Sequence, residues 1–510
     1  MKQAHTPLVL VVLDGWGVRE ETQHNPIALA RTPFFDELWQ MAPHACLDAS
    51  GVEVGLPKGQ MGNSEIGHMV IGSGMVIPTD LVRIQEALDR GEGDTNPVLQ
   101  SLFTHTVEHG SALHLIGLIG PGGVHAHQGH LIGLIRAAKR AGVSKVFIHG
   151  FTDGRDTPPQ SAAAFVRELE GELKQIGLGQ ISTLCGRFFA MDRDTNWERI
   201  EAAERALFEH GGQTSLQAPS ETLDALYAAD HSDEQLAPLV FPGGEGETCS
   251  PIQNGDAVFF FNFRADRAVQ LSRRILERIK DQDIAFATMT IYADDLACPV
   301  AFPSFVPPVT LAEELSKAGL TQAHIAETEK YAHATYFLNG GRSEPFPGEV
   351  HVMIESQKVR THDLAPEMRA KEITDAALLQ LEEGKDFLFL NYANADMVGH
   401  TAHEQAIITA VEVVDQELAR LAAGVAARGG ALFITADHGN AEQNFDHASQ
   451  QRHTAHTTNL VPAILTVPSV TLRSRGTLAD IAPTLLELLN LPIPAEMTGR
   501  SLLLPNEKKM

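Results

Sequence analysis

The sequence predicts an α/β protein made of two α/β domains with mostly parallel sheets. Short apolar runs alternate along the chain with longer amphipathic stretches rich in Ala, Leu and Glu, which is typical of strand–helix–strand units. The length of 510 residues exceeds what one compact core usually needs, so more than one domain is expected. A composition of 43% hydrophobic and 20% charged residues indicates a folded protein and argues against a disordered one.

The predicted strands and helices are spread over the whole chain. The apolar runs that predict buried strands are Leu8–Leu13, Leu113–Ile119, Lys145–His149, Ala257–Phe261, Asp386–Leu390 and Ala431–Thr435. The predicted helices are Gln160–Gly177, Arg267–Asp281, Ile373–Glu383 and Glu404–Arg428. Ligands of open parallel sheets lie beyond the carboxyl ends of the strands. The residues that follow each predicted strand are therefore the candidate site residues.

The charge of the chain argues against a general nucleic-acid or membrane-surface partner. Lys and Arg number 39 against 65 Asp and Glu, a formal net charge of −26. A field of this sign repels phosphate backbones and anionic lipid, although a local cluster of arginines can still bind a small anion. No apolar run has the length needed to cross a bilayer, and Leu8–Leu13 is too short for the core of a signal peptide. Because the four cysteines are scattered without a CxxC spacing, which fits reduced thiols, we predict a cytoplasmic location.

Carboxylates and imidazoles follow three of the predicted strands, and together they predict a metal centre. Any one of them alone is better explained as a surface residue or a hydrogen-bonded core residue, but all of them gather at strand ends. Mixed Asp and His ligation suits Mn²⁺ or Zn²⁺, and the number of candidates exceeds what one ion takes, so two ions are implied. The candidates are Asp14, Asp396, His400, Asp437, His438 and His456.

Ser64 lies in the segment GQMGNSEIGH, after a Gly/Asn turn and before a predicted helix. One interpretation is an N-cap serine. The other is a nucleophile, whose hydroxyl needs a base or a metal to lower its pKa. In the second case the N-terminus of the helix would offer backbone N–H groups to a phosphoryl group.

The strands in the middle of the chain are followed by His and Arg. Arginine makes bidentate contacts with carboxylate and phosphate, so such a cluster in an acidic chain predicts a pocket for a small polyanion. The opposing interpretation is ordinary pairing with neighbouring aspartates at the surface. The candidates are His125, Arg155, Arg187, Arg193, Arg264 and Arg267, with Lys330 as a further cation.

Ten motifs, in this order, resemble those of the cofactor-independent (2,3-bisphosphoglycerate-independent) phosphoglycerate mutases. They are VLDGWG, MGNSEIGH, GGVHAHQGH, FTDGRDTPP, GRFFAMDRD, NFRADR, TEKYAHATYFLNGG, YANADMVGH, TADHGN and HTAHTTN, and they span essentially the whole chain. The resemblance implies an alkaline-phosphatase-like core with an inserted substrate domain. It also implies an isomerase of glycolysis and gluconeogenesis that interconverts 3-phosphoglycerate and 2-phosphoglycerate without 2,3-bisphosphoglycerate.

The resemblance further implies roles for individual residues. It implies two Mn²⁺ ions per chain, other divalent ions being possible, and Ser64 as the phosphorylated nucleophile. One ion would be held by Asp396, His400 and His456, and the other by Asp14, Ser64, Asp437 and His438. The family points to His456, where spacing alone leaves His453 open. The implied substrate pocket consists of His125, Arg155, Asp156, Arg187, Arg193, Arg264, Arg267 and Lys330.

The order of these motifs also predicts the domains. The metal candidates come from the two ends of the chain and the arginines from its middle. We therefore predict a discontinuous phosphatase-like, metal-binding domain of residues 1–77 and 310–510, interrupted by a substrate-binding (phosphotransferase) domain of residues 78–309. Gly72–Pro78 and Pro303–Pro308 are the predicted hinges, since Pro- and Gly-rich segments mark linkers. We predict a monomer.

Other functions use the same core. A metal-dependent phosphatase or sulfatase need not hold its dephosphorylated product, whereas a mutase must, so the arginine-bearing domain favours a mutase. A non-catalytic metal-binding protein has no use for Ser64 beside complete ligand sets. Phosphopentomutase shares the core, but it is expected to match the DGRDTPP and MDRD segments poorly.

Overall fold

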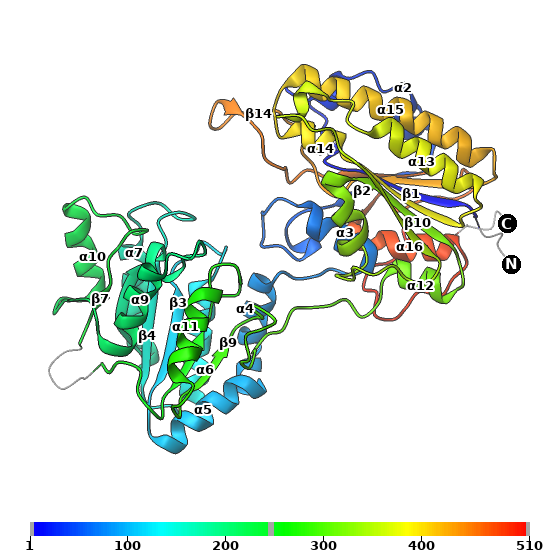
Figure 1. Ribbon diagram of the computed structural model, residues 1–510. Coiled ribbons are helices and arrows are strands. Elements are labelled where there is room, and N and C mark those ends of the chain that lie inside the picture. Colours follow the sequence, from blue (N-terminus) through cyan, green and yellow to red (C-terminus); the bar gives the residue numbers. More distant parts are fainter. Residues whose placement is uncertain (1–4, 243–248, 506–510) are drawn as a thin grey trace. The chain divides into compact units, whose positions relative to one another are not determined.

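The computed structural model describes residues 5–242 and 249–505 (Figure 1). By its internal contacts the chain divides into two compact units, Met1–Thr79 with Phe305–Met510, and Asp80–Ser304. The first unit is thus discontinuous in sequence. Each unit contains one large, mostly parallel sheet, which confirms the predicted fold class.

The first unit contains an eight-stranded sheet in the order β11-β10-β12-β1-β13-β16-β2-β17. The strands are β1 (Leu8–Leu13), β2 (His44–Asp48), β10 (Gln322–Glu327), β11 (Glu349–Ile354), β12 (Phe387–Tyr392), β13 (Ala431–Thr435), β16 (Val461–Leu465) and β17 (Arg475–Thr477). The strands from β11 to β13 run parallel, whereas β16 is antiparallel to both of its neighbours. Val12 pairs with Asn391 on one side and Thr435 on the other. The carboxyl ends of β12, β1 and β13 therefore meet at one edge of the sheet.

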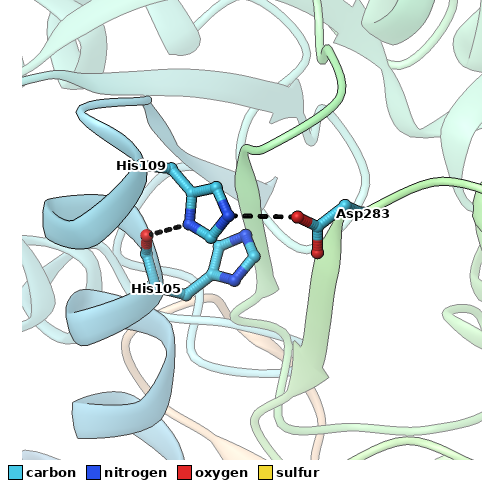
Figure 2. A group of neighbouring side chains, drawn as sticks. All are labelled: His105, His109 and Asp283. Carbon is cyan, nitrogen blue, oxygen red and sulfur yellow. Dashed lines mark hydrogen bonds and ion pairs between the residues drawn. The ribbon is translucent and has the colours of Figure 1, made fainter.

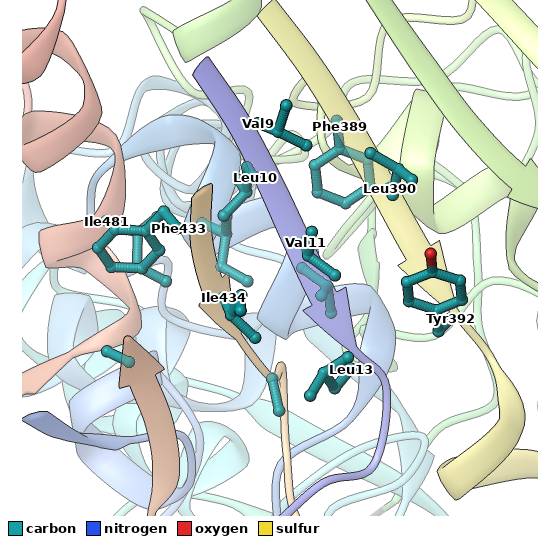
Figure 3. Close-up of a cluster of buried hydrophobic side chains, with 14 of the residues drawn as sticks. Val9, Leu10, Val11, Leu13, Phe389, Leu390, Tyr392, Phe433, Ile434 and Ile481 are labelled. Atoms are coloured by element: carbon teal, nitrogen blue, oxygen red, sulfur yellow. The ribbon is translucent and has the colours of Figure 1, made fainter. Parts of the chain in front are cut away.

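Helices cover both faces of this sheet. In Figure 1, α13 and α15 lie on one face, and α3, α12 and α16 lie on the other. Every residue of β1 is buried, as expected for a central parallel strand between two layers of helices. Figure 3 shows side chains of β1, β12 and β13 packed together with Ile481 of α16. The helices are α1 (Pro26–Leu29), α2 (Pro33–Met41), α3 (Ser64–Ser73), α12 (Leu311–Lys317), α13 (Ala370–Glu382), α14 (Asn394–Gly399), α15 (Glu404–Ala426) and α16 (Ile481–Leu488). A small hairpin pairs β14 (Phe445–Asp446) with β15 (Gln451–Arg452).

The second unit has a seven-stranded sheet in the order β6-β7-β5-β4-β3-β8-β9. The strands are β3 (Leu113–Leu118), β4 (Val146–Thr152), β5 (Gln180–Gly186), β6 (Gln213–Thr214), β7 (Leu239–Val240), β8 (Ala257–Phe260) and β9 (Ala285–Thr288). The helices are α4 (Asp80–Asp89), α5 (Pro97–His109), α6 (Gln128–Arg140), α7 (Ala162–Ile176), α8 (Arg187–Ala190), α9 (Trp197–Glu209), α10 (Pro219–Ala228) and α11 (Val269–Ile279).

The strand order of the second unit changes direction between β3 and β8. From β3 the chain proceeds to β4 and β5 on one side, whereas β8 and β9 lie on the other. In open parallel sheets such a switch leaves a crevice beyond the carboxyl ends of the two strands. The segments that follow β3 and β8 contain His125 and Arg264, so the topology places both of them near the switch. Among the helices described, none has the length and apolar character that crossing a membrane requires.

Candidate functional site

Three buried carboxylates meet at the edge of the first unit's sheet. Asp14 follows β1, Asp396 lies in α14 just after β12, and Asp437 follows β13, and each is at most 2% exposed. Burying several like charges costs free energy unless cations lie among them. Lys330 supplies one cation, because its Nζ lies 2.7 Å from Asp14 Oδ1 and 2.7 Å from Asp396 Oδ2.

Lys330 was expected among the cations of the arginine pocket, but it lies in the first unit. It closes the short helix η3 (Thr328–Lys330) just after β10, which is the neighbour of β12. Burial lowers the pKa of Lys330, but Asp14 and Asp396 outweigh it and raise that pKa above its usual range. Burial raises the pKa of Asp396, and Lys330 reverses this and holds it well below its usual range. Lys330 is therefore charged and belongs to the carboxylate cluster.

Ser64 is the first residue of α3, and the cap of this helix is the preceding residue. The side chain of Asn63 accepts a hydrogen bond from Ile66 N at 2.9 Å. The Ser64 hydroxyl is thereby left to face the cluster. Its Oγ lies 2.9 Å from His438 Nε2, 2.8 Å from Lys330 Nζ and 3.3 Å from Asp14 Oδ1. The geometry therefore favours the interpretation of Ser64 as a site residue over that of a cap.

Two histidines complete the other side of the cluster. His400 Nδ1 lies 2.8 Å from the carbonyl oxygen of Thr454, and His456 Nδ1 lies 2.8 Å from that of Gly62. A carbonyl only accepts hydrogen bonds, so each Nδ1 carries a proton, and Nε2 is the nitrogen that can bind a cation when the ring is neutral. Both Nε2 atoms lie 3.2 Å from Asp396 Oδ1 and 3.2 Å from each other. Without a metal, the contact with Asp396 raises the pKa of His400, and it raises that of His456 against the effect of burial. It is thus His456, and not His453, that the fold brings to Asp396.

This donor set fits divalent metal ions. Ligand atoms of Asp396, His400 and His456 lie within 4.8 Å of one another, as do those of Asp14, Asp396 and His438. Among the residues that the structure describes, none donates a hydrogen bond to the buried Oδ2 of Asp437. Imidazole nitrogens and carboxylate oxygens that converge in this way are the ligands that a divalent cation takes.

The arginine candidates gather in the second unit around His125. Arg187 is buried, and its Nη1 lies 2.6 Å from both Asp153 Oδ1 and Asp156 Oδ2. Its Nη2 donates to His125 Nε2 at 3.0 Å. Because guanidinium only donates, this ring nitrogen is unprotonated. Burial and the neighbouring Arg187 lower the pKa of His125 to about 4, so the imidazole is neutral at pH 7.

Three of the remaining arginines are about half-exposed and are also paired with acids. Arg155 pairs with Glu234 at 2.6 Å, and Arg193 and Arg264 both pair with Asp266, at 3.0 and 3.1 Å. Arg267 donates to the carbonyl of Met191. Burial and then the nearby Arg193, Arg187 and Arg155 lower the pKa of the Arg267 guanidinium. Arg155, Arg193 and Arg264 therefore do pair with neighbouring acids. The guanidinium groups nevertheless lie close enough together for their charges to lower the pKa of Arg267.

Comparison with known proteins decides the family. A family model described as the metalloenzyme superfamily matches residues 6–493. A protein of Chloroflexus aggregans named 2,3-bisphosphoglycerate-independent phosphoglycerate mutase is 46% identical, over 98% of this chain and 99% of its own length. A protein of the same name from Listeria innocua is also 46% identical, with the same two coverages. The chain belongs to the 2,3-bisphosphoglycerate-independent phosphoglycerate mutases.

A solved structure agrees with this membership. The phosphoglycerate mutase of Leishmania mexicana, crystallised at low cobalt concentration, is 30% identical and matches with a TM-score of 0.63. The alignment covers 99% of this chain and 98% of that one. The family predicted from the ten motifs is confirmed. The chain is a phosphoglycerate mutase of a metalloenzyme superfamily.

Three residues that contact the carboxylate cluster were missed by the sequence analysis. Asn391 donates to Asp14 Oδ2 at 2.8 Å, Asn440 donates to Asp396 Oδ1 at 2.9 Å, and His68 Nδ1 lies 3.3 Å from Asp437 Oδ2. Asn391 directly follows the predicted strand Asp386–Leu390, Asn440 lies in the motif TADHGN, and His68 lies in the motif MGNSEIGH. His68 is one helical turn after Ser64, so the spacing of four was the available signal.

Proposed function

We propose that this mutase interconverts 3-phosphoglycerate and 2-phosphoglycerate in glycolysis and gluconeogenesis without 2,3-bisphosphoglycerate, through a phosphoserine on Ser64. The position of Ser64 Oγ carries the proposal, because it lies within 3.3 Å of His438 Nε2, Lys330 Nζ and Asp14 Oδ1. A serine hydroxyl becomes nucleophilic only where its proton can be removed and its developing charge stabilised. A metal ion held by Asp14, Asp437 and His438 would promote loss of the proton, and the ammonium of Lys330 suits the second task.

Two Mn²⁺ ions are the proposed cofactors, and other divalent ions would suit the same donors. One set of ligands is Asp396, His400 and His456, and the other is Asp14, Ser64, Asp437 and His438. When bound, such ions lower the pKa of a coordinated hydroxyl and neutralise charge on a transferring phosphoryl group. The outer partners act on the ligands: Asn391 holds Asp14, Asn440 holds Asp396, and backbone carbonyls fix the ring tautomers of His400 and His456.

Lys330 is proposed to stabilise the phosphoryl group on Ser64. Its Nζ lies 2.8 Å from Ser64 Oγ, so a phosphoryl group on that oxygen would lie against the ammonium. The first turn of α3 adds backbone N–H groups at the same place. This is a substrate-binding role, as the resemblance implies, but it is exercised in the first unit.

The cluster around His125 is proposed to bind the glycerate part of the substrate. The guanidinium groups of this cluster repel one another, and Arg193 and Arg264 share a single carboxylate, that of Asp266. An added anion would therefore be attracted to the cluster and would reduce this repulsion. His125 is neutral and can exchange a proton with a substrate hydroxyl, since its Nδ1 has no hydrogen-bond partner among the described residues. The proposed pocket consists of His125, Arg155, Asp156, Arg187, Arg193, Arg264 and Arg267.

The remaining proposals concern the whole chain. The metal-binding domain is proposed to be the first unit and the substrate-binding domain the second. Because every proposed ligand comes from one chain, we propose that a monomer is active. A cytoplasmic location is proposed from the scattered cysteines, and the absence of nucleic-acid and membrane partners is proposed from the net charge of −26.

The decisive experiment follows the two phosphoglycerates by ³¹P NMR with Mn²⁺ present and no added 2,3-bisphosphoglycerate. The wild type should equilibrate them, and Ser64→Ala should lose at least about 10³-fold in rate. Ser73→Ala is the matched control, because Ser73 closes the same helix and is buried, and within the described part of the chain its hydroxyl bonds only to the carbonyl of Met75.

Three outcomes would contradict the proposal. Substantial mutase activity in Ser64→Ala would remove the serine from the reaction. A wild-type requirement for 2,3-bisphosphoglycerate would contradict the cofactor-independent route. Release of inorganic phosphate in place of isomerisation would favour the metal-dependent phosphatase.

A further inference from the structure

A second cluster of potential metal ligands lies in the second unit. His105 and His109 come from the last turn of α5, and Asp283 comes from the segment between α11 and β9 (Figure 2). The two imidazole rings are stacked with their centroids 4.2 Å apart, and His109 Nε2 lies 3.0 Å from Asp283 Oδ2. One ligand atom of each residue lies within 4.8 Å of the other two.

This cluster is separate from the arginine pocket. His109 ends α5 just before β3 begins at Leu113, and Asp283 lies just before β9 begins at Ala285. The three residues therefore lie at the amino ends of the parallel strands. His125 and Arg264 follow β3 and β8 at the carboxyl ends. The two groups thus belong to opposite edges of one sheet.

The second ring nitrogen of His109 faces a carboxylate. Its Nδ1 lies 2.8 Å from the carbonyl oxygen of His105, and a carbonyl only accepts, so Nδ1 carries the proton. When the ring is neutral, its unprotonated Nε2 faces Asp283, which is an acceptor as well; the carbonyl of His105 and the carboxylate of Asp283 raise the pKa of His109, so a proton can hold this contact until a metal replaces it. Two acceptors at 3.0 Å are stable only with a proton or a metal cation between them.

His105 adds an unsatisfied nitrogen at the same place. Its Nε2 is sealed from solvent and has no hydrogen-bond partner among the described residues. Buried polar atoms of this kind are rare, because the desolvation cost is not offset. An imidazole nitrogen without a partner beside the contact between His109 and Asp283 is a second, independent sign of a missing cation.

The three ligands lie on backbone that is already fixed. The Asp283 N–H donates to Asn254 Oδ1 at 2.7 Å, and its carbonyl accepts from Gly255 N at 2.6 Å. The helix that carries the two histidines spans Pro97–His109 and is capped by the side chain of Asn96. A site on fixed elements binds its ligand without a large ordering cost.

We propose that His105, His109 and Asp283 bind a late first-row divalent cation, for which Zn²⁺ is the best fit. Two imidazoles and one carboxylate match the ligands that Zn²⁺ takes in proteins, with a further position open to water. The ion would join the end of α5 to the segment that enters β9. Its role would be to stabilise the second unit, and it would be additional to the ions of the first unit.

Zinc binding to the full-length, Mn²⁺-loaded protein tests the proposal. After dialysis against Zn²⁺, bound metals are counted by mass spectrometry, and affinity is measured against a chelator of known strength. His109→Ala and the isosteric Asp283→Asn should each bind about one Zn²⁺ per chain fewer than the wild type, or bind it at least about tenfold more weakly. Zinc that exchanges into the first unit cancels in this comparison.

His231→Gln is the matched control, because it removes an exposed histidine of the same unit that lies in no such cluster among the described residues. It should bind as much Zn²⁺ as the wild type. Zn²⁺ should also raise the Tm of the wild type above that of His109→Ala, since an ion that binds only the folded state stabilises it. Circular dichroism verifies that the variants are folded.

Equal zinc binding in wild type, His109→Ala and Asp283→Asn would overturn the proposal. The contact between His109 and Asp283 would then be an imidazolium–carboxylate ion pair without a metal. A loss of zinc in His231→Gln as large as that in His109→Ala would overturn it as well, because the effect would not belong to this cluster.

Discussion

At the scale of single residues, Lys330 balances the charge of the buried carboxylates. Three acids and one lysine share a region from which water is largely excluded, and the lysine contacts two of the acids directly. Removing one partner of such a group leaves uncompensated buried charge, which costs far more than losing a surface ion pair. The need for Lys330 should therefore depend on whether other cations are bound.

Lys330→Met should destabilise the metal-free protein by about 3–5 kcal/mol and the Mn²⁺-loaded protein by clearly less. The methionine keeps an unbranched side chain that is one atom shorter, and it removes the charge. Urea unfolding with EDTA and with excess Mn²⁺ measures both values. Lys317→Met is the control, because Lys317 is half-exposed and its ion pairs among the described residues are with Glu313 and Glu314 at the surface. Equal losses with and without metal would contradict this account.

His130 is a buried imidazole that should be neutral in the folded protein. Its Nε2 donates to the carbonyl of Leu81 at 2.9 Å, and its Nδ1 has no hydrogen-bond partner among the described residues. Burial lowers the pKa of His130 to about 4, from an ordinary value of 6.5. As the pH falls, the unfolded chain takes up the proton first. The stabilisation is therefore complete above pH 6.5 and is lost as the pH falls towards 4.

Between pH 7 and pH 5 the wild type should lose up to about 2 kcal/mol of its free energy of unfolding through this histidine. His130→Gln can still donate to Leu81 but does not titrate, so its loss should be smaller by that amount. Urea unfolding at the two pH values, in EDTA, gives the difference. His231→Gln should keep the wild-type pH dependence. If the free energy of unfolding of His130→Gln falls between pH 7 and pH 5 by as much as that of the wild type, His130 is not the titrating group.

Single residues also show where sequence reasoning ends. Asp14, Asp396 and Asp437 could be predicted together, because each follows an apolar run and parallel strands end at one edge. Lys330 could not be placed, because its position depends on β10 lying beside β12, and strand order is a tertiary property. Its positive charge instead grouped it with the arginines.

At the scale of elements, α3 must lie close to the end of β13 for Ser64 to reach the cluster. A Cβ added at Gly67 would lie 2.9 Å from both the Cβ and the carbonyl oxygen of Asp437. Both atoms belong to a segment that is fixed by the sheet, so the helix would have to move. Gly67 therefore sets the distance between α3 and Asp437.

Gly67→Ala should slow isomerisation about 10–100-fold, because small misplacements of a reacting group have effects of this size. Gly171→Ala in α7 is the control, since a Cβ there meets nothing within 4 Å. It should leave the rate unchanged and raise stability by up to about 1 kcal/mol. Initial rates and Tm values of both variants are the measurements. A wild-type rate for Gly67→Ala would mean that α3 adjusts without moving Ser64.

Element boundaries were predicted well where apolar pattern alone decides them. β1 and β13 have the predicted limits, Leu8–Leu13 and Ala431–Thr435. β12 was expected to end at Leu390 but continues through Tyr392. Asn391 interrupts the apolar run, yet its side chain is buried and bonded to Asp14, so the strand continues beneath the site. From the sequence alone, a polar site residue inside a strand cannot be distinguished from a polar residue that ends the strand.

At the scale of the whole molecule, each unit has its own hydrophobic core. The inserted unit occupies one continuous segment, and the metal-ligand candidates all come from the segments that flank it. Motif order could predict this division, since the two kinds of chemistry are separated along the chain. It follows that Mn²⁺ should act on the stability of one unit only.

Removing Mn²⁺ should therefore lower the unfolding temperature of the first unit and leave that of the second unchanged. A ligand present at about 100 times its Kd stabilises the folded state by about 2.7 kcal/mol, so the shift should be measurable. Calorimetry in zinc-free buffer, with Mn²⁺ and with EDTA, gives the transitions. Val411→Ala and Val166→Ala each remove buried methyl groups from one core and so identify which transition belongs to which unit. Equal shifts of both transitions on adding EDTA would mean that the second unit also depends on Mn²⁺, against the assignment of every Mn²⁺ ligand to the first unit.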